Sequence, residues 1–127
     1  MQEKQLFEYA VIRIVPRVER QEFFNVGIIM YCASLNFLEA KFELDQKKIA
    51  AFSNDLNVDD LHKRLCVFEQ ICLADKRAGE IATLPAAARF RWLTSIRSTV
   101  LQTSPVHPGF SENMQQTLDK LFNELVK

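Results

Sequence analysis

Three segments near the start of the chain carry the hydrophobic pattern of β-strands. Residues 7–15 read FEYAVIRIV, where β-branched and aromatic residues are dense and apolar residues occupy both faces. Residues 26–32 read VGIIMYC, and Gly27 inside this segment leaves room for a close neighbour or marks a bulge. Over residues 37–44, apolar and charged residues alternate, which indicates a strand with one face in water. The pattern therefore predicts three consecutive strands.

The middle of the chain changes to a helical pattern. A short helix is predicted over residues 47–52, and a longer helix begins at Asn57, a residue type that caps helix N-termini. Along the longer helix, apolar residues recur at helical spacing and form one stripe: Leu61, Leu65, Phe68 and Cys72. Residues 75–84 are expected to form a surface loop. Pro85 then opens a third helix over residues 86–93, because its missing N–H costs nothing at a helix start.

The end of the chain predicts one more strand and one more helix. Residues 97–103 have strand composition, and Pro105, Pro108 and Gly109 break the chain after them. Ser111 is expected to cap a final helix. The apolar face of that helix is formed by Met114, Leu118, Leu121, Phe122 and Leu125.

The element order βββαααβα predicts an α+β fold. Three early strands and one late strand do not alternate with helices, so we expect a mixed or mainly antiparallel sheet of about four strands with helices packed on it. The length of 127 residues, with 48% hydrophobic and 25% charged residues, fits one globular domain spanning residues 1–127. The third and last strands are the expected sheet edges, and either edge can pair in a homodimer, which the sequence leaves open.

Charge and apolar segments limit the classes of partner and compartment. Sixteen basic and sixteen acidic residues give zero formal charge, which removes bulk attraction to nucleic acid or to anionic membranes. The longest uncharged apolar run, residues 26–33, is too short to cross a bilayer, and the N-terminus lacks a signal-peptide pattern. We therefore expect a cytoplasmic protein with no membrane association.

Motifs for metal, cofactor and covalent chemistry are sparse. The three cysteines contain no C-x-x-C pair, and His62 and Cys66, one helical turn apart, lack a second ligand pair. The three glycines lie too far apart for a phosphate-binding loop. From these two observations, neither a metal nor a cofactor is predicted. Ser104 and His107 are the remaining nucleophile and base candidates, although their proline-rich setting favours a stiff loop before a helix.

Arg13 lies in the middle of an otherwise apolar strand. An arginine at such a position needs a partner or access to water, because an unpaired buried charge is very costly. Glu22 and Asn25, close after the strand, are the nearest candidates to meet it. Two interpretations remain open: a buried ion pair between strand and loop, or a binding site that uses the guanidinium group.

A basic, partly aromatic segment runs from Ile81 to Ser111. It contains no acidic residue and three arginines: Arg89, Arg91 and Arg97. Phe90 lies between the first two arginines, Trp92 follows the second, and Gln102 adds a neutral hydrogen-bonding group. Such a pattern can stack on bases or hold phosphates. It also arises when the aromatic residues anchor a short helix to the core and the arginines pair with acids elsewhere.

Two blocks of sequence resemble a known family. Residues 9–29 follow the pattern Y-x-x-x-R-x-V-P-x-x-x-R-x-E-x-x-N-V-G-I-I, and R-F-R-W-L at 89–93 is followed by R-S-T at 97–99, Gln102 and Ser104. These blocks resemble the bacterial domain-of-unknown-function family DUF3037 over nearly the whole chain. The family supplies no activity, cofactor or catalytic residue. Its members resemble small companion proteins encoded beside a HipA-type kinase, which implies such a kinase as partner.

The hypothesis that fits these features best is a small non-catalytic binding or regulatory module. It presents an arginine-rich, partly aromatic face to a protein partner, with a HipA-type kinase as the partner that the resemblance implies. This hypothesis requires that the first and last strands are neighbours, so that the two blocks meet on one surface. The predicted binding residues are Arg13, Glu22, Asn25, Arg89, Arg91, Trp92, Arg97 and Gln102.

Two alternatives from other functional classes stay open. The first is an enzyme that acts on a phosphorylated or nucleotide-like ligand, with Glu22 as general base and with these arginines as anion clamps: Arg13, Arg89 and Arg97. The second is a single-stranded nucleic-acid binder that uses the arginines and aromatic residues of positions 89–92. The zero net charge makes nucleic acid an unfavoured partner.

Overall fold

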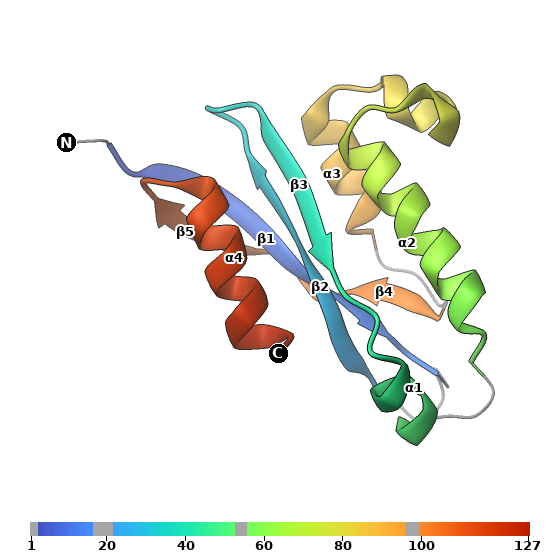
Figure 1. The fold of residues 1–127 in the computed structure, drawn as a ribbon. Helices are drawn as coiled ribbons and strands as arrows, with labels where there is room; N and C mark the ends of the chain where they lie inside the picture. Colours follow the sequence, from blue (N-terminus) through green and yellow to red (C-terminus); the bar gives the residue numbers. More distant parts are fainter. Residues whose placement is uncertain (1–2, 17–21, 53–55, 96–99) are drawn as a thin grey trace.

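An antiparallel sheet of five strands forms the centre of the molecule (Figure 1). The structure is a computed structural model and describes residues 3–16, 22–52, 56–95 and 100–127. The strands are β1 (Gln5–Ile14), β2 (Phe24–Cys32), β3 (Phe37–Phe42), β4 (Leu101–Thr103) and β5 (His107–Ser111). The predicted α+β fold with a mainly antiparallel sheet is confirmed.

β1 is the central strand. Along its edge opposite β2, it pairs with two short strands, β4 and β5. The sheet order is β3-β2-β1-β4, while β5 also pairs with β1. β5 pairs with the N-terminal half of β1, and β4 pairs with residues 12–14 at its other end. The first strand and the predicted last strand are therefore neighbours, as the binding hypothesis requires.

The helices cover the two faces of the sheet separately. The helices are α1 (Gln46–Phe52), α2 (Val58–Cys72), α3 (Ala86–Leu93) and α4 (Met114–Leu125). α2 and α3 lie on one face, and α4 packs against β2 and β3 on the other (Figure 1). No helix in the part of the chain that the structure describes has the length and apolar character needed to cross a bilayer.

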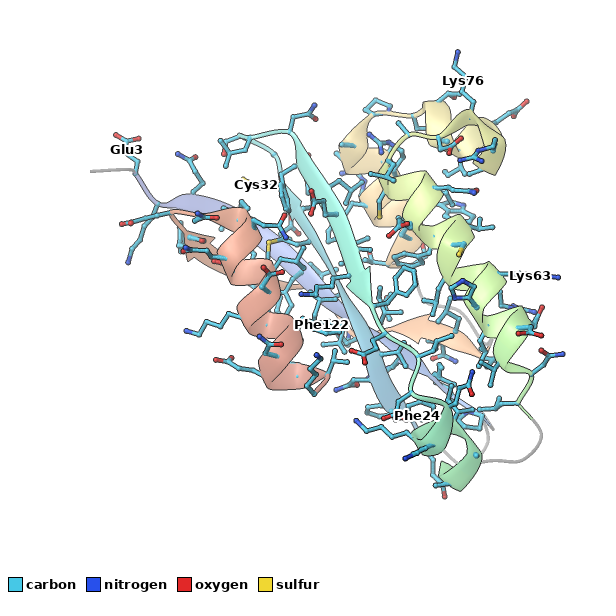
Figure 2. All side chains as sticks on the ribbon, viewed as in Figure 1. Glu3, Phe24, Cys32, Lys63, Lys76 and Phe122 are labelled. Atoms are coloured by element: carbon cyan, nitrogen blue, oxygen red, sulfur yellow. The ribbon has the colours of Figure 1, made fainter. Side chains whose placement is uncertain are left out.

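Side chains along each strand point alternately to the two faces of the sheet, which divides the apolar residues between two cores. Ala10, Ile12 and Ile14 of β1 are buried together with the predicted stripe of α2. Phe7, on the opposite face of β1, joins the core beneath α4, where Phe122 is 2% exposed and lies between the helix and the sheet (Figure 2). Because successive side chains of a strand point to opposite faces, the parity of a β1 residue tells which helices it faces.

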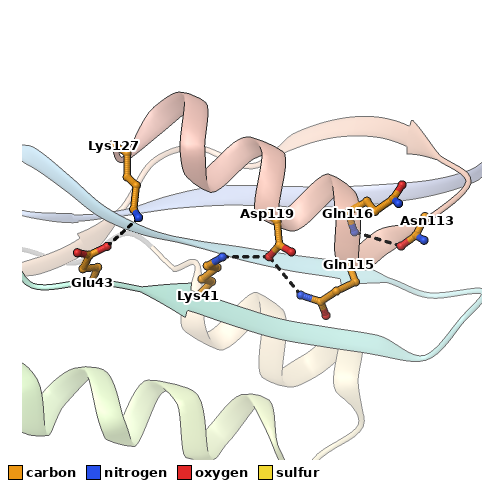
Figure 3. A network of polar contacts seen from close by, with 7 residues as sticks. All are labelled: Lys41, Glu43, Asn113, Gln115, Gln116, Asp119 and Lys127. Carbon is orange, nitrogen blue, oxygen red and sulfur yellow. Dashed lines mark hydrogen bonds and ion pairs between the residues drawn. The ribbon is translucent and has the colours of Figure 1, made fainter.

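Two ion pairs at the surface connect α4 and the C-terminus to β3 and the residue just after it. Lys41 pairs with Asp119 at 3.1 Å, and Lys127 approaches Glu43 at 3.6 Å (Figure 3). The Lys41 ammonium also lies 4.8 Å from the ring centroid of Phe122. Both ion pairs are substantially exposed and contribute little stability, so the apolar contacts of Phe122 hold α4 in place.

Three local expectations were wrong. Residues 107–111 form β5 although Pro108 lies within them, because an edge strand tolerates a residue that lacks an N–H. The final helix is capped by Asn113, whose side chain accepts a hydrogen bond from the Gln116 N–H, and not by Ser111. The expected loop 75–84 contains two short 3₁₀ helices, Lys76–Ala78 and Glu80–Thr83. In the predicted strand 97–103, the described part forms β4, and residues 97–99 lie outside the described residues.

Candidate functional site

The central residue of the first predicted site, Arg13, has an amide side chain beside it on each neighbouring strand. Arg13 is directly opposite Asn25 on β2 and opposite Gln102 on β4. Opposite residues of antiparallel strands point to the same face, so the three side chains form a row across the sheet. Arg13 is an odd-numbered residue of β1, like Phe7 in the core beneath α4, so this row lies on the α4 face of the sheet.

The guanidinium of Arg13 is only partly satisfied by its surroundings. Its Cζ lies 4.2 Å from the ring centroid of Phe23, which gives a cation–π contact. The Arg13 Nε is buried and has no hydrogen-bond partner in the part of the chain that the structure describes. The side chain as a whole is half-buried, so part of the group stays within reach of solvent.

The two partners suggested for Arg13 differ in their settings, and of the two Asn25 is directly opposite it. Asn25 is half-buried, and its Nδ2 donates a hydrogen bond of 2.9 Å to the Leu125 carbonyl oxygen near the end of α4. Glu22 precedes β2 and is exposed. The exposure of Glu22 excludes a closed, fully buried ion pair with Arg13.

Arg89 has a structural role at the end of α2. Its Nη1 donates hydrogen bonds to the carbonyl oxygens of Ile71 and Cys72 at 2.9 and 2.8 Å, and its Nε donates to the Leu84 carbonyl oxygen at 2.9 Å. The last carbonyls of a helix lack intrahelical donors and carry partial negative charge, which suits a guanidinium group. These bonds occupy the group that the sequence suggested as an anion clamp.

Arg91 and Trp92 lie on the outer side of α3. Arg91 is exposed and Trp92 is 44% exposed, whereas Phe90 between Arg89 and Arg91 is buried at 3%. The aromatic residues of the segment therefore divide between core and surface. Phe90 anchors α3 and stacks on Tyr31 with ring centroids 5.3 Å apart.

The expectation that these arginines meet on one surface was wrong for Arg13 and Arg89. Arg13 lies on the α4 face of the sheet, whereas Arg89 caps α2 on the other face. The sheet between the two groups keeps them apart. Arg97, the third predicted clamp, lies outside the described residues.

A groove that the sequence did not reveal runs beside Trp92. It has a volume of about 280 Å³. It is lined by Arg64, Val67, Phe68, Ile71, Trp92, Leu93 and Leu101. Val67 is 45% exposed at its rim although it is apolar. Val67, an apolar residue of α2 outside the predicted stripe, could have indicated an exposed apolar surface at this place.

The nucleophile candidates have structural roles. Ser104 is buried, its Oγ accepts a hydrogen bond from the Val11 N–H at 2.8 Å, and it donates one to the Pro105 carbonyl oxygen. His107 is exposed and packs on Tyr9 with ring centroids 5.5 Å apart. Burial raises the pKa of Cys72 to about 12, against the opposing effect of Arg89, so its thiol is protonated at neutral pH.

No group of three metal-ligating side chains occurs among residues 3–16, 22–52, 56–95 and 100–127. The Cys66 Sγ and the His62 Nε2 lie 3.5 Å apart on α2 and make a hydrogen-bonded pair. At the start of the 3₁₀ helix Lys76–Ala78, the side-chain hydrogen bond from Arg77 lowers the pKa of Asp75. These contacts stabilise local structure.

Comparison with known proteins identifies the family of this chain. Searches of the curated proteins and of the solved structures found no match. A model of the family described as "Protein of unknown function (DUF3037)" matches residues 9–126. That range includes both sequence blocks that carried the resemblance, and the chain belongs to the DUF3037 family.

Proposed function

We propose that this protein is a non-catalytic binding module that holds a protein partner in the groove between α2, α3 and β4. The observation that carries the proposal is the exposed apolar rim of that groove, formed by Trp92 at 44% and Val67 at 45% exposure. Large apolar side chains exposed beside a concave surface are typical of protein-binding sites.

The composition of the groove fits an anchor side chain of a partner. Its floor is formed by buried residues of both helices, including Phe68 and Leu93. Arg64 lines one side and is tied to Asp60 at 3.0 Å, and Arg91 is exposed on the helix that carries Trp92. Tryptophan and arginine around an apolar centre are the residue types that dominate binding energy at protein interfaces.

The alternatives draw less support from the geometry. The enzyme hypothesis used Arg89 as one of its three anion clamps, and the Nε and Nη1 of Arg89 donate to backbone carbonyl oxygens. The nucleic-acid hypothesis relied on stacking by Phe90 and Trp92, and Phe90 is buried. Among the described residues, the groove keeps one exposed aromatic ring and an apolar floor, which favour a protein ligand.

A HipA-type kinase is the partner that we propose on the basis of the family resemblance. Trp92 is the only tryptophan in the chain, so labelling with 5-fluorotryptophan gives one ¹⁹F resonance that reports on the groove. Titration with the HipA-type kinase of the same host is expected to shift or broaden this resonance in a saturable way. An unchanged resonance would contradict the proposed partner.

Two matched variants test the place of binding. Val67→Glu puts a charge at the groove rim. It is expected to weaken binding by ~10-fold or more, because the new carboxylate must lose its water when the partner's apolar surface covers it. Leu73→Glu makes the same kind of change at a residue 65% exposed that does not line the groove, and is expected to bind like the wild type. Equal affinities of the two variants would place the partner elsewhere.

An oligonucleotide titration at low salt separates the remaining alternative. The groove hypothesis expects no binding of a single-stranded oligonucleotide. Binding that weakens steeply with salt and is lost in Arg91→Ala would replace this proposal with the nucleic-acid hypothesis.

A further inference from the structure

The row of polar side chains on the α4 face, Arg13, Asn25 and Gln102, lies away from the groove, and the proposed function does not explain the arginine at its centre. Arg13 carries a permanent positive charge in the middle strand of the sheet. Among the described parts of the chain, no carboxylate forms an ion pair with it, and its Nε is buried without a hydrogen-bond partner. We propose that Arg13 is the centre of a binding site for a small oxyanion, a carboxylate or a phosphate group.

The charge of Arg13 gives the first reason. A guanidinium that is taken partly out of water loses solvation, and a buried donor without an acceptor destabilises the folded protein. An apolar residue at this position would have no charge to desolvate, and the β1 residues on the same face, Phe7 and Val11, pack in the core beneath α4. An arriving oxyanion supplies the missing acceptor and the missing negative charge together.

The contact with Phe23 gives the second reason. The ring lies beneath the Arg13 Cζ at 4.2 Å and occupies one side of the guanidinium group. An aromatic hydrocarbon ring has no lone pair that could accept from the N–H donors of a guanidinium. Phe23 therefore stabilises the charge of Arg13 by a cation–π contact without supplying the acceptor that its Nε lacks among the described residues.

The neighbouring amides give the third reason. Asn25 and Gln102 lie on the two strands beside β1, in register with Arg13, and adjacent strands are about 4.8 Å apart. The Asn25 amide is oriented by its bond to the Leu125 carbonyl oxygen, which uses only one of its two N–H donors. A charged fork between neutral amides is a common arrangement for binding oxyanions.

The site is tested by the NMR signal of the Arg13 Nε–Hε group in the full chain. Inorganic phosphate and acetate are titrated separately at constant ionic strength. A saturable shift of the Arg13 resonance with phosphate alone assigns the site to phosphate, with acetate alone to carboxylate, and with both to oxyanions in general. No saturable shift with either anion would overturn the proposal.

Variants show whether the shift belongs to this site. Arg13→Gln is expected to abolish the saturable shifts of backbone amides around Asn25 and Gln102, while Arg91→Gln on the other face leaves them unchanged. Retention of those shifts in a folded Arg13→Gln protein would also overturn the proposal. If Arg13→Gln does not fold, Arg13→Lys keeps the charge without the fork and is expected to bind ~10-fold more weakly. Affinity equal to the wild type in Arg13→Lys would refute the role of the fork.

This inference does not rest on the proposed partner. Arg13 and the groove lie on opposite faces of the sheet. A kinase that fails to bind leaves the anion titration unaffected, and an absent anion shift leaves the ¹⁹F titration unaffected.

Discussion

Arg89 donates a hydrogen bond from Nη1 to the carbonyl oxygen of Cys72 at 2.8 Å, and so joins α3 to the last turn of α2. The same nitrogen reaches the Ile71 carbonyl oxygen at 2.9 Å. One side chain thus supplies a donor to the Cys72 carbonyl oxygen, which has no intrahelical partner, and another to the Ile71 carbonyl oxygen, which also accepts from the Ala74 N–H. This contact sets the relative position of the two helices whose surfaces form the groove at Trp92.

Replacement of Arg89 by alanine is expected to lower the free energy of unfolding by about 2 kcal/mol, because charge-assisted bonds to helix-terminal carbonyls are lost. Urea denaturation followed by circular dichroism measures the change. Arg91→Ala, on the exposed side of the same helix, is the control and is expected to change stability by less than ~0.5 kcal/mol. Equal effects of the two variants would contradict a capping role for Arg89.

Gly27 is required by the close approach of β3. A Cβ at this position would lie 2.5 Å from the Lys41 carbonyl oxygen and 2.8 Å from the Phe42 Cβ. Gly27→Ala is therefore expected to force β2 and β3 apart and to lower the free energy of unfolding by about 2 kcal/mol or more. Denaturant titration measures this.

Gly109→Ala is the comparison for that prediction. The added Cβ would meet the far end of the Phe7 ring, 2.5 Å from Cζ, and not a backbone atom. A ring can move where a paired strand cannot, so the loss is expected to be smaller than for Gly27→Ala. A larger loss for Gly109→Ala would show that the Phe7 ring is held more rigidly than the β2–β3 pair.

The strands and helices were predictable where the hydrophobic pattern has a clear period. The strand at 7–15, the cap at Asn57 and the stripe along α2 were all confirmed, because each depends on local residue types and spacing. β5 was missed because Pro108 and Gly109 are turn residues by local preference. Its pairing with β1, including Phe7 beside Gly109, is a tertiary effect that overrides the local signal.

The candidate site was predictable only in part for a similar reason. Asn25 and Gln102 are the neighbours of Arg13 across the sheet. The register of Asn25 depends on the β-bulge between Ile12 and Arg13, and Gln102 reaches β1 because the chain comes back to the sheet after α3. The partner of Arg89 is backbone, and carbonyl oxygens leave no trace in a sequence. Side-chain identity therefore indicated which arginines were unusual without indicating what each one contacts.

Ser104 holds together the edge of the sheet between β4 and β5. Its Oγ accepts from the Val11 N–H at 2.8 Å, while its own N–H donates to the Val11 carbonyl oxygen at 2.8 Å. Ser104→Ala leaves the Val11 N–H without its acceptor and is expected to cost about 1–3 kcal/mol. Hydrogen exchange is expected to accelerate at the Val11 amide in this variant.

Ser95→Ala removes a hydroxyl that is exposed and bonded to the Arg91 carbonyl oxygen at 2.8 Å. Because water replaces an exposed partner, this control is expected to change stability by less than ~0.5 kcal/mol. Unchanged exchange at Val11 in Ser104→Ala would show that the serine hydroxyl does not protect that amide.

The Cys72 thiol makes stability depend on pH in the alkaline range. Burial raises its pKa to about 12 in the folded protein, and Arg89 opposes the rise. The unfolded chain has an ordinary thiol pKa of about 8.5. Between these values the unfolded state has released the proton and the folded state has kept it, so stability falls as pH rises, by up to about 1.4 kcal/mol per pH unit.

At pH 10 this effect is expected to remove about 2 kcal/mol of the stability present at pH 8. Cys72→Ala removes the titrating thiol, so its stability is expected to fall less over the same interval, whatever offset the substitution itself introduces. Urea unfolding of both proteins at pH 8, 9 and 10 measures the difference, in which the contributions of all other titrating groups cancel. Parallel pH dependences would show that the Cys72 thiol ionises in the folded protein as readily as in the unfolded chain, in conflict with its burial against α3.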